Sequence, residues 1–276
     1  MDSNLKIAFF GTPRFAQIVL GELLKSPYQP NIIITAQDSK VGRGRQIKSS
    51  LVKQTAQENN IKVIEKLDPK LLGSFDLAIL VAYGKILPQE ILEIPKHGFL
   101  NVHPSLLPKY RGPSPIHSAI LSGDNKTGVS LILLDEEVDH GPILNQSEVA
   151  ITPEDTHETL IDKLAREGAK ILLQTLPDYL DGKITPKPQN HTKATTTEHI
   201  QKQNGFIHPQ NPPDKKIVGR MIRAYFPWPT VWTKLDGKII KFLPGGLIQP
   251  EGKRPMTKKE FLNGYPRTKE SIEKII

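Results

Sequence analysis

Short apolar runs alternate with segments of helical periodicity over the first 176 residues, and this alternation limits the possible folds more than any other feature of the chain. Apolar runs of this length are typical of strands that are buried on both faces. Helical segments between such strands indicate a mainly parallel sheet covered by helices. The expected strands are 5–10, 31–36, 61–64, 76–82, 98–103 and 128–134. We therefore predict an α/β fold with a Rossmann-like, largely parallel sheet.

The first expected strand runs into a turn, 10–14 (FGTPR), where the first helix begins. Thr12 is expected to cap this helix, with Pro13 as its first residue. The turn lacks the GxGxxG spacing of dinucleotide-binding proteins, so a nicotinamide cofactor is not indicated. A long amphipathic helix is predicted at 155–176, and His157 at its start is expected to be a surface residue rather than a metal ligand.

The composition changes in the last third of the chain. Pro, Gln, Asn, Thr and His dominate 186–213, with little apolar periodicity, which is typical of a linker. Beyond it, a helix is predicted at 214–224. Strands at 231–235 and 238–243 should form a hairpin, because an Asp-Gly dipeptide joins two β-rich runs. The predicted domains are 1–187 for the α/β unit, 188–205 for the linker and 206–276 for a small β-rich unit.

The net charge of +8 is concentrated in the same region. From His191 to the end, 16 Lys and Arg stand against 7 Asp and Glu, a net charge of +9, so the first 190 residues carry a net charge of −1. A nearly neutral body with a basic end indicates contact with a polyanion such as nucleic acid. A solvated basic tail would have the same composition, so charge alone leaves both interpretations open.

Composition also excludes several classes of protein. Cysteine is absent, so the chain has no disulfide and no thiolate zinc site, which fits a reducing cytoplasm. No stretch approaches the ~20 apolar residues of a transmembrane helix, and no metal motif such as HExxH is present. We expect a cytoplasmic monomer that needs neither a membrane nor a metal.

The segment that carries chemistry is 101–112 (NVHPSLLPKYRG). Asn101 and His103 lie two residues apart at the end of a predicted strand, so their side chains share one face. Ligands of open α/β sheets bind at the C-terminal ends of the strands. An amide that donates to an oxyanion and an imidazole that moves a proton suit acyl-type transfer there. An Asn-x-His pair alone is a weak signal, since most such histidines have no special role.

The whole segment closely resembles the signature of the 10-formyltetrahydrofolate-dependent formyltransferases, and 134–143 (LDEEVDHGPI) resembles their second element. The resemblance implies the formyltransferase fold, with Asn101, His103 and Asp139 as catalytic residues. It also implies 10-formyltetrahydrofolate as the formyl donor and no metal. The residues implied to bind folate are Ser105, Leu106, Leu107, Pro108, Val81, Tyr83 and Gly84.

Four further segments are similar to the members of this family that formylate initiator methionyl-tRNA in translation initiation. They are 9–16 (FFGTPRFA), 81–88 (VAYGKILP), 222–229 (IRAYFPWP) and 248–256 (IQPEGKRPM). The resemblance spans most of the chain and implies initiator methionyl-tRNA as the partner. The Gly-containing basic loop at 38–53 suits contact with a phosphate backbone, although a solvated mobile loop would look the same. The residues expected to bind tRNA are Lys40, Arg43, Arg45 and Lys48, with Arg43 resembling the key arginine of the family.

Two features depart from the family pattern. Residue 140 is His where Thr is expected, which places a second titratable group next to Asp139. Only 48 residues follow Trp228, too few for the family's five-stranded OB-like barrel, so we expect a reduced, OB-like C-terminal sheet of two or three strands.

Three other functions remain open at this point. One is formyl transfer to an amino-sugar nucleotide or another small amine, which would fit the shortened C-terminal region. A second is a non-catalytic RNA-binding module on a retained enzyme fold. The third is a hydrolase that deformylates the folate with water.

Overall fold

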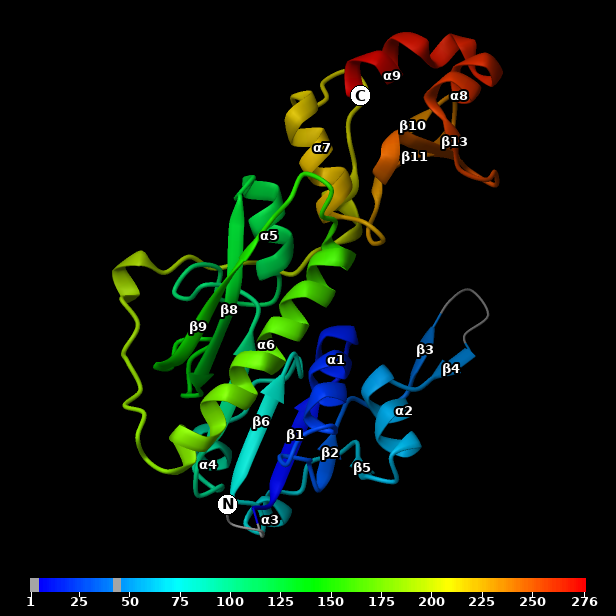
Figure 1. The fold of residues 1–276 in the computed structure, drawn as a ribbon. Coiled ribbons are helices and arrows are strands. Elements are labelled where there is room, and N and C mark those ends of the chain that lie inside the picture. Colours follow the sequence, from blue (N-terminus) through cyan, green and yellow to red (C-terminus); the bar gives the residue numbers. More distant parts are fainter. Residues whose placement is uncertain (1–4, 42–45) are drawn as a thin grey trace. The chain divides into compact units, whose positions relative to one another are not determined.

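The computed structural model describes residues 5–41 and 46–276, and the chain forms two compact units (Figure 1). The first comprises Met1–Pro113, Thr127–Val149 and Ile161–Thr196. The second comprises Ser114–Lys126, Ala150–Leu160 and Thr197–Ile276. Helix α6 (His157–Leu180) contributes its start to the second unit and the remainder to the first. In the part of the chain described here, no helix is both long and apolar enough to cross a bilayer.

The first unit is built around a seven-stranded sheet with the order β5-β2-β1-β6-β7-β8-β9. In this order, the first five strands, β5-β2-β1-β6-β7, pair in parallel, whereas β8 is antiparallel to β7. The predicted largely parallel, Rossmann-like sheet is therefore confirmed. The strands are β1 (Ile7–Gly11), β2 (Ile32–Ile34), β5 (Lys62–Ile64), β6 (Leu77–Val81), β7 (Phe99–His103), β8 (Lys126–Leu133) and β9 (Ile143–Ala150).

Helices pack on both faces of this sheet (Figure 1). On one face, Phe10 joins Leu72 of α3 and Leu92 of α4 in a buried apolar cluster. On the other face, α6 lies close against β7, since a side chain at Gly168 would collide with Val102. The remaining helices of this unit are α1 (Arg14–Leu23), α2 (Leu51–Glu58), α3 (Pro69–Leu72) and α4 (Gln89–Leu92).

Helix α1 begins one residue later than predicted. Pro13, with extended backbone, is the N-cap, and Arg14 is the first helical residue. The Thr12 hydroxyl oxygen instead accepts a hydrogen bond from the backbone N–H of Ala36 at 3.3 Å. Thr12 therefore ties the end of β1 to the segment that follows β2, and does not cap the helix.

Three strands of this unit are missing from the sequence prediction. Strand β9 alternates partly buried with exposed residues and carries polar side chains at 145–148 (NQSE), so it has no apolar run. Strands β3 (Ser39–Val41) and β4 (Gln46–Lys48) pair antiparallel where a loop was expected. Apolar runs identify strands buried on both faces. No residue of β9 is fully buried, and β3 and β4 contain only one apolar residue each.

The second unit contains a four-stranded sheet with the order β10-β11-β12-β13 and antiparallel pairing. Strands β10 (Val231–Leu235) and β11 (Lys238–Leu243) form the predicted hairpin. Its turn residues, Asp236 and Gly237, have φ of 47° and 77°, the left-handed backbone of a two-residue type I′ turn. The sheet has four strands rather than the expected two or three, because β12 (Leu247–Pro250) also pairs with the two-residue β13 (Met256–Thr257).

The helices of the second unit are α5 (Pro115–Ser122), α7 (Lys215–Ala224), α8 (Lys258–Gly264) and α9 (Lys269–Ile275). The expected surface position of His157 is wrong. Its ring is partly buried and stacks on His117, with ring centroids 3.7 Å apart and an interplanar angle of 27°. Burial lowers the pKa of His157 to about 3 and that of His117 to about 4, so both rings are neutral near pH 7.

Candidate active site

Three polar side chains meet near the C-terminal end of β7. Asn101 and His103 lie on one face of that strand, and Asp139 lies on the connection from β8 to β9. The amide nitrogen Nδ2 of Asn101 donates to Oδ1 of Asp139 at 3.1 Å, and Nδ1 of His103 lies 3.3 Å from the same oxygen. Asn101 and His103 are only 5% and 4% exposed. The structure therefore brings together the three residues that the resemblance implied to be catalytic.

The backbone around Asp139 directs its carboxylate towards β7. Asp139 has a φ of 51°, in the left-handed region that few residues other than glycine adopt. Its Oδ2 accepts a hydrogen bond from the backbone N–H of Gly112 at 2.8 Å. A side chain at Gly141 would collide with the carbonyl oxygen of Leu133, so this turn requires glycine there.

His103 and Asp139 form a buried pair of opposite charge. Burial acts to lower the pKa of His103, but the charge and hydrogen bond of Asp139, with the Tyr110 carbonyl, outweigh burial and raise it above its ordinary value. Burial acts to raise the pKa of Asp139, but His103 and the Gly112 amide bring it below its ordinary value. Nε2 of His103 lies 2.9 Å from the Tyr110 carbonyl oxygen. Because both ring nitrogens face acceptors, the imidazolium form of His103 is favoured.

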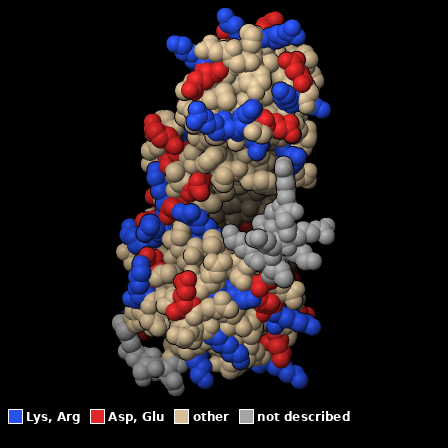
Figure 2. Space-filling model, turned by 90° about the vertical axis from the view of Figure 1, so that its right-hand side faces the viewer, with Lys and Arg blue, Asp and Glu red and all other residues tan. Residues whose placement is uncertain are grey.

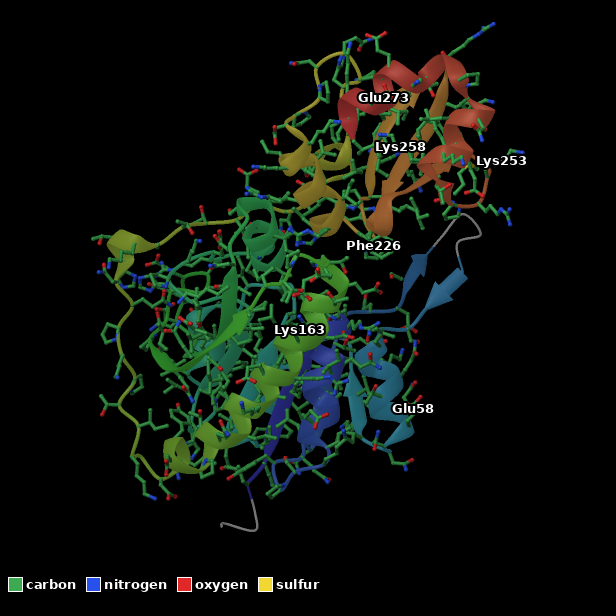
Figure 3. The ribbon with its side chains drawn as sticks, turned by 45° about the horizontal axis from the view of Figure 1, so that its top comes forward. Glu58, Lys163, Phe226, Lys253, Lys258 and Glu273 are labelled. Carbon is green, nitrogen blue, oxygen red and sulfur yellow. The ribbon has the colours of Figure 1, made fainter. Side chains whose placement is uncertain are left out.

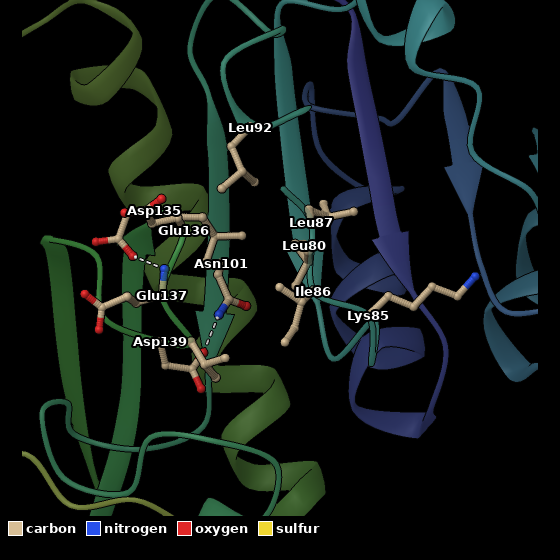
Figure 4. A pocket seen from close by; sticks show the side chains of 12 residues that line it. Leu80, Lys85, Ile86, Leu87, Leu92, Asn101, Asp135, Glu136, Glu137 and Asp139 are labelled. Carbon is tan, nitrogen blue, oxygen red and sulfur yellow. Dashed lines mark hydrogen bonds between the residues drawn. The ribbon is translucent and has the colours of Figure 1, made fainter. Parts of the chain in front are cut away.

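An open pocket adjoins this group (Figure 4). Leucines from β6, α4 and the segment between them form one wall, and the acidic side chains that follow β8 form the other, with Asn101 and Asp139 beside them. At its rim, Ile86 is 75% exposed and Val138 is 50% exposed. The lining residues are Leu80, Lys85, Ile86, Leu87, Leu92, Asn101, Leu134, Asp135, Glu136, Glu137, Val138 and Asp139.

None of the residues implied to bind folate is among the residues that line this pocket, although Val81 and Gly84 are sequence neighbours of the lining residues Leu80 and Lys85. Ser105 is buried, and its hydroxyl donates to the Lys109 carbonyl oxygen at 2.6 Å. Leu107 and Tyr83 are also buried, and Tyr83 belongs to the apolar cluster on the Phe10 face of the sheet. The pocket is lined instead by 85–87, directly after Tyr83 and Gly84. A direct folate contact for Ser105, Leu106, Leu107, Pro108, Val81, Tyr83 and Gly84 stays a prediction.

The basic segment expected to bind tRNA is described only in part. Arg43 and Arg45 lie outside the described residues, while Lys40 is in β3 and Lys48 in β4, where Lys40 pairs with Ile47. Lys53, at the end of that segment, forms ion pairs with Asp38 at 2.9 Å and Glu65 at 2.5 Å.

Two buried residues at the site were not predicted. Arg111 donates from Nε and Nη2 to the side-chain oxygen of Gln189, at 3.1 and 2.7 Å. Gln189 in turn donates to the carbonyl oxygens of Asp139 and Gly141, at 2.9 and 2.8 Å. Gln189 lies in the Pro- and Asn-rich stretch whose composition predicts a linker, and nothing in a single sequence distinguishes it from its polar neighbours.

His140, the departure from the family pattern, does not face the Asp139 carboxylate. Its Nδ1 lies 2.6 Å from Oδ2 of Asp135, and its ring stacks on His191 with centroids 4.0 Å apart. Among the residues that the structure describes, no three His, Asp or Glu side chains are grouped so as to hold a metal ion.

Comparison with known proteins identifies the family. Residues 5–176 match the family model described as formyl transferase. A methionyl-tRNA formyltransferase of Thermodesulfovibrio yellowstonii is 37% identical, with 94% of this chain and 95% of that protein covered. One from Listeria monocytogenes is 40% identical over 86% of this chain and 77% of that protein.

Among solved structures, the chain is similar in fold to an N-formyltransferase from Helicobacter canadensis, solved with folinic acid and dTDP-3-aminofucose. The TM-score is 0.67 at 21% identity, with 88% of this chain and 94% of that chain covered. The sequence matches and the fold agree: the chain belongs to the formyl transferase family, in the group of the methionyl-tRNA formyltransferases.

Proposed function

We propose that this protein transfers the formyl group of 10-formyltetrahydrofolate to the amino group of initiator methionyl-tRNA, with Asn101, His103 and Asp139 as the catalytic residues. One observation carries the proposal: Asn101 and Asp139 line a pocket, and His103 contacts Asp139 directly behind them. An amide donor and a carboxylate at one pocket wall, with an imidazolium directly behind them, are groups that suit acyl-type transfer to an amine.

The two walls of the pocket suit a folate. A pterin is a flat ring with N–H donors along one edge, so it is complemented by apolar side chains on one side and by carboxylates on the other. Leu87 and Leu92 supply the first, and Glu136 supplies the second (Figure 4). The exposed Ile86 and Val138 at the rim would lose contact with water when a ligand binds between them.

The reaction proceeds by direct transfer. The neutral amine attacks the formyl carbon, a C–N bond forms, and the formyl oxygen becomes an oxyanion. Asn101 has a second amide N–H beyond the one given to Asp139, and this N–H donates to the oxyanion. The bond from carbon to N10 then breaks, and N10 takes the proton that the amine loses.

His103 stabilises the oxyanion through its positive charge. Asp139 keeps the imidazole protonated and oriented, much as the acid of a hydrolytic triad does. This role is preferred to that of a neutral base, because the hydrogen-bond acceptors at both ring nitrogens leave no free lone pair to receive a proton.

In this proposal, tRNA contacts two regions. One is the basic second unit, and the other is the basic segment with Lys40, Arg43, Arg45 and Lys48. Lys and Arg side chains are spread over the face of the second unit in view in Figure 2. Lys253, in the turn between β12 and β13, is an exposed basic residue of this unit (Figure 3). We further propose that 1–187 carry catalysis, that 188–205 connect to a tRNA-facing 206–276, and that the protein works as a metal-free monomer in the cytoplasm.

Replacing Arg43 and Arg45 by Ala tests the tRNA part of the proposal. KM for methionyl-tRNA should rise on the order of tenfold, and the salt dependence of binding should weaken by about one unit of log–log slope per lost phosphate contact. KM for 10-formyltetrahydrofolate should not change. Lys62→Ala with Lys70→Ala is the matched control, because it removes the same charge from exposed positions of the same unit. An unchanged KM for tRNA in the arginine variant would refute the role of this segment.

A further inference from the structure

We propose that Gln189 is a positioning residue that holds Asp139 in its catalytic geometry through the protein backbone. The inference rests on the proposed catalytic role of Asp139. Gln189 is 4% exposed, and both ends of its amide group are engaged. The contacts connect three parts of the first unit that are far apart in the sequence.

The NH₂ group of Gln189 bridges the turn that carries Asp139. It donates to the carbonyl oxygen of Asp139 at 2.9 Å and to that of Gly141 at 2.8 Å. These two carbonyls flank His140, so a single side chain fixes the peptide planes on both sides of the turn. Asp139 itself has the left-handed φ of 51°, a conformation that an isolated chain would leave readily. The two hydrogen bonds therefore hold a backbone shape that the local sequence does not favour.

Arg111 fixes which way the Gln189 amide points. Its Nε and Nη2 both donate to the amide oxygen, at 3.1 and 2.7 Å, so the NH₂ group has to face the two carbonyls. Nη2 of Arg111 also lies 2.8 Å from Nδ1 of His191, whose ring stacks on His140. Arg111 is 9% exposed, which makes a reversed amide costly, since it would set N–H donors against the guanidinium.

This arrangement fixes the distances from the Asp139 carboxylate to Asn101 and His103. With the turn held, Oδ1 of Asp139 lies 3.1 Å from Nδ2 of Asn101 and 3.3 Å from Nδ1 of His103. If the turn relaxed, the carboxylate would move away from β7, and His103 would lose the charge that keeps it protonated. The hydrogen bonds of Gln189 go to Arg111 and to the backbone of the turn, and none goes to these three side chains, so it acts through the backbone.

Gln189→Glu is the decisive variant. It keeps an oxygen for Arg111 but replaces the donating NH₂ group by an oxygen that faces two carbonyls. We expect kcat to fall on the order of 10²-fold, as for a misplacement of about 1 Å at a reacting centre, with little change in KM for either substrate. Gln189→Leu, which removes both ends of the contact, should do the same. Asn145→Ala is the control, because it removes a partly buried hydrogen bond to Thr175 in the same unit and leaves the hydrogen bonds of the turn in place.

A second readout does not depend on turnover. The pKa of His103, followed by NMR titration of its ring, should fall towards its ordinary value in Gln189→Glu and stay raised in Asn145→Ala. A wild-type kcat and an unmoved His103 titration in Gln189→Glu would overturn the inference. Asp139→Asn separates this failure from that of the proposed function. If Asp139→Asn turns over normally, the catalytic role of Asp139 is wrong; if it is slow while Gln189→Glu is normal, only the role of Gln189 is wrong.

Discussion

His103→Ala should lower kcat for formyl transfer by about 10²–10³-fold, the usual cost of removing one group that stabilises an oxyanion, while folate binding survives. His103 is absent from the lining of the pocket, where Asn101 and Asp139 stand, so the substitution removes a charge behind the wall and leaves the apolar wall intact. The loss should therefore appear in kcat and not in the Kd of the folate. Both quantities are measured directly, by formylation of methionyl-tRNA and by calorimetry with 5-formyltetrahydrofolate.

His97→Ala is the matched control for this experiment. His97 belongs to the same unit and is partly buried, and its ring packs edge-on against Tyr179 at a centroid distance of 6.4 Å. Its removal should leave kcat within the error of the wild type. Near-normal turnover of His103→Ala would remove His103 from the catalytic group.

Asp139→Asn should have a loss of similar size, on the order of 10²–10⁴-fold in kcat, because a neutral amide cannot stabilise the charged imidazole. The carboxylate raises the pKa of His103 above its ordinary value, so activity of the wild type should fall as the pH rises through that raised pKa. In Asp139→Asn this fall should begin at a lower pH. A pH profile of kcat for the two proteins measures the shift, and identical alkaline limbs would contradict the pairing.

The same pair links stability to pH. The raised pKa of His103 contributes stability that is fully present below its unfolded pKa and is lost as the pH rises through the folded pKa. The lowered pKa of Asp139 contributes stability that is present above its unfolded pKa and is lost as the pH falls through the folded value. The pair should therefore stabilise the fold most between about pH 4 and pH 6.5, the unfolded pKa values of the two groups. The difference in Tm between wild type and Asp139→Asn should be largest in that range.

The parts of the fold that the sequence predicts are those set by local patterns. Apolar runs locate the strands that are buried on both faces, and Asp236-Gly237 locates a hairpin whose turn has the left-handed backbone that this dipeptide favours. Strand β9 could not be found in this way, because its polar residues are typical of an edge position. The two-residue β13 also has no recognisable sequence pattern, since it is a strand only because it pairs with β12.

In the candidate site, too, only the features set by local patterns could be predicted. The common face of Asn101 and His103 follows from strand alternation, and their approach to Asp139 was expected only through the resemblance to formyltransferases. The hydrogen bonds of Arg111 and Gln189 that hold the turn at Asp139 could not be predicted. Arg111 and Gln189 are 78 residues apart in the chain, and their contact depends on how a polar, irregular segment crosses the first unit. A single sequence contains no periodic or spacing signal for such a contact.

The proposed function depends most on which acceptor receives the formyl group at this site. Initial rates should therefore be measured with 10-formyltetrahydrofolate and three acceptors in parallel: charged initiator tRNA, an amino-sugar nucleotide, and water alone. We predict rapid turnover with methionyl-tRNA, and little above background with the other two. Preferred turnover of the amino sugar, hydrolysis without an acceptor, or no reaction with any of the three would contradict the proposed function.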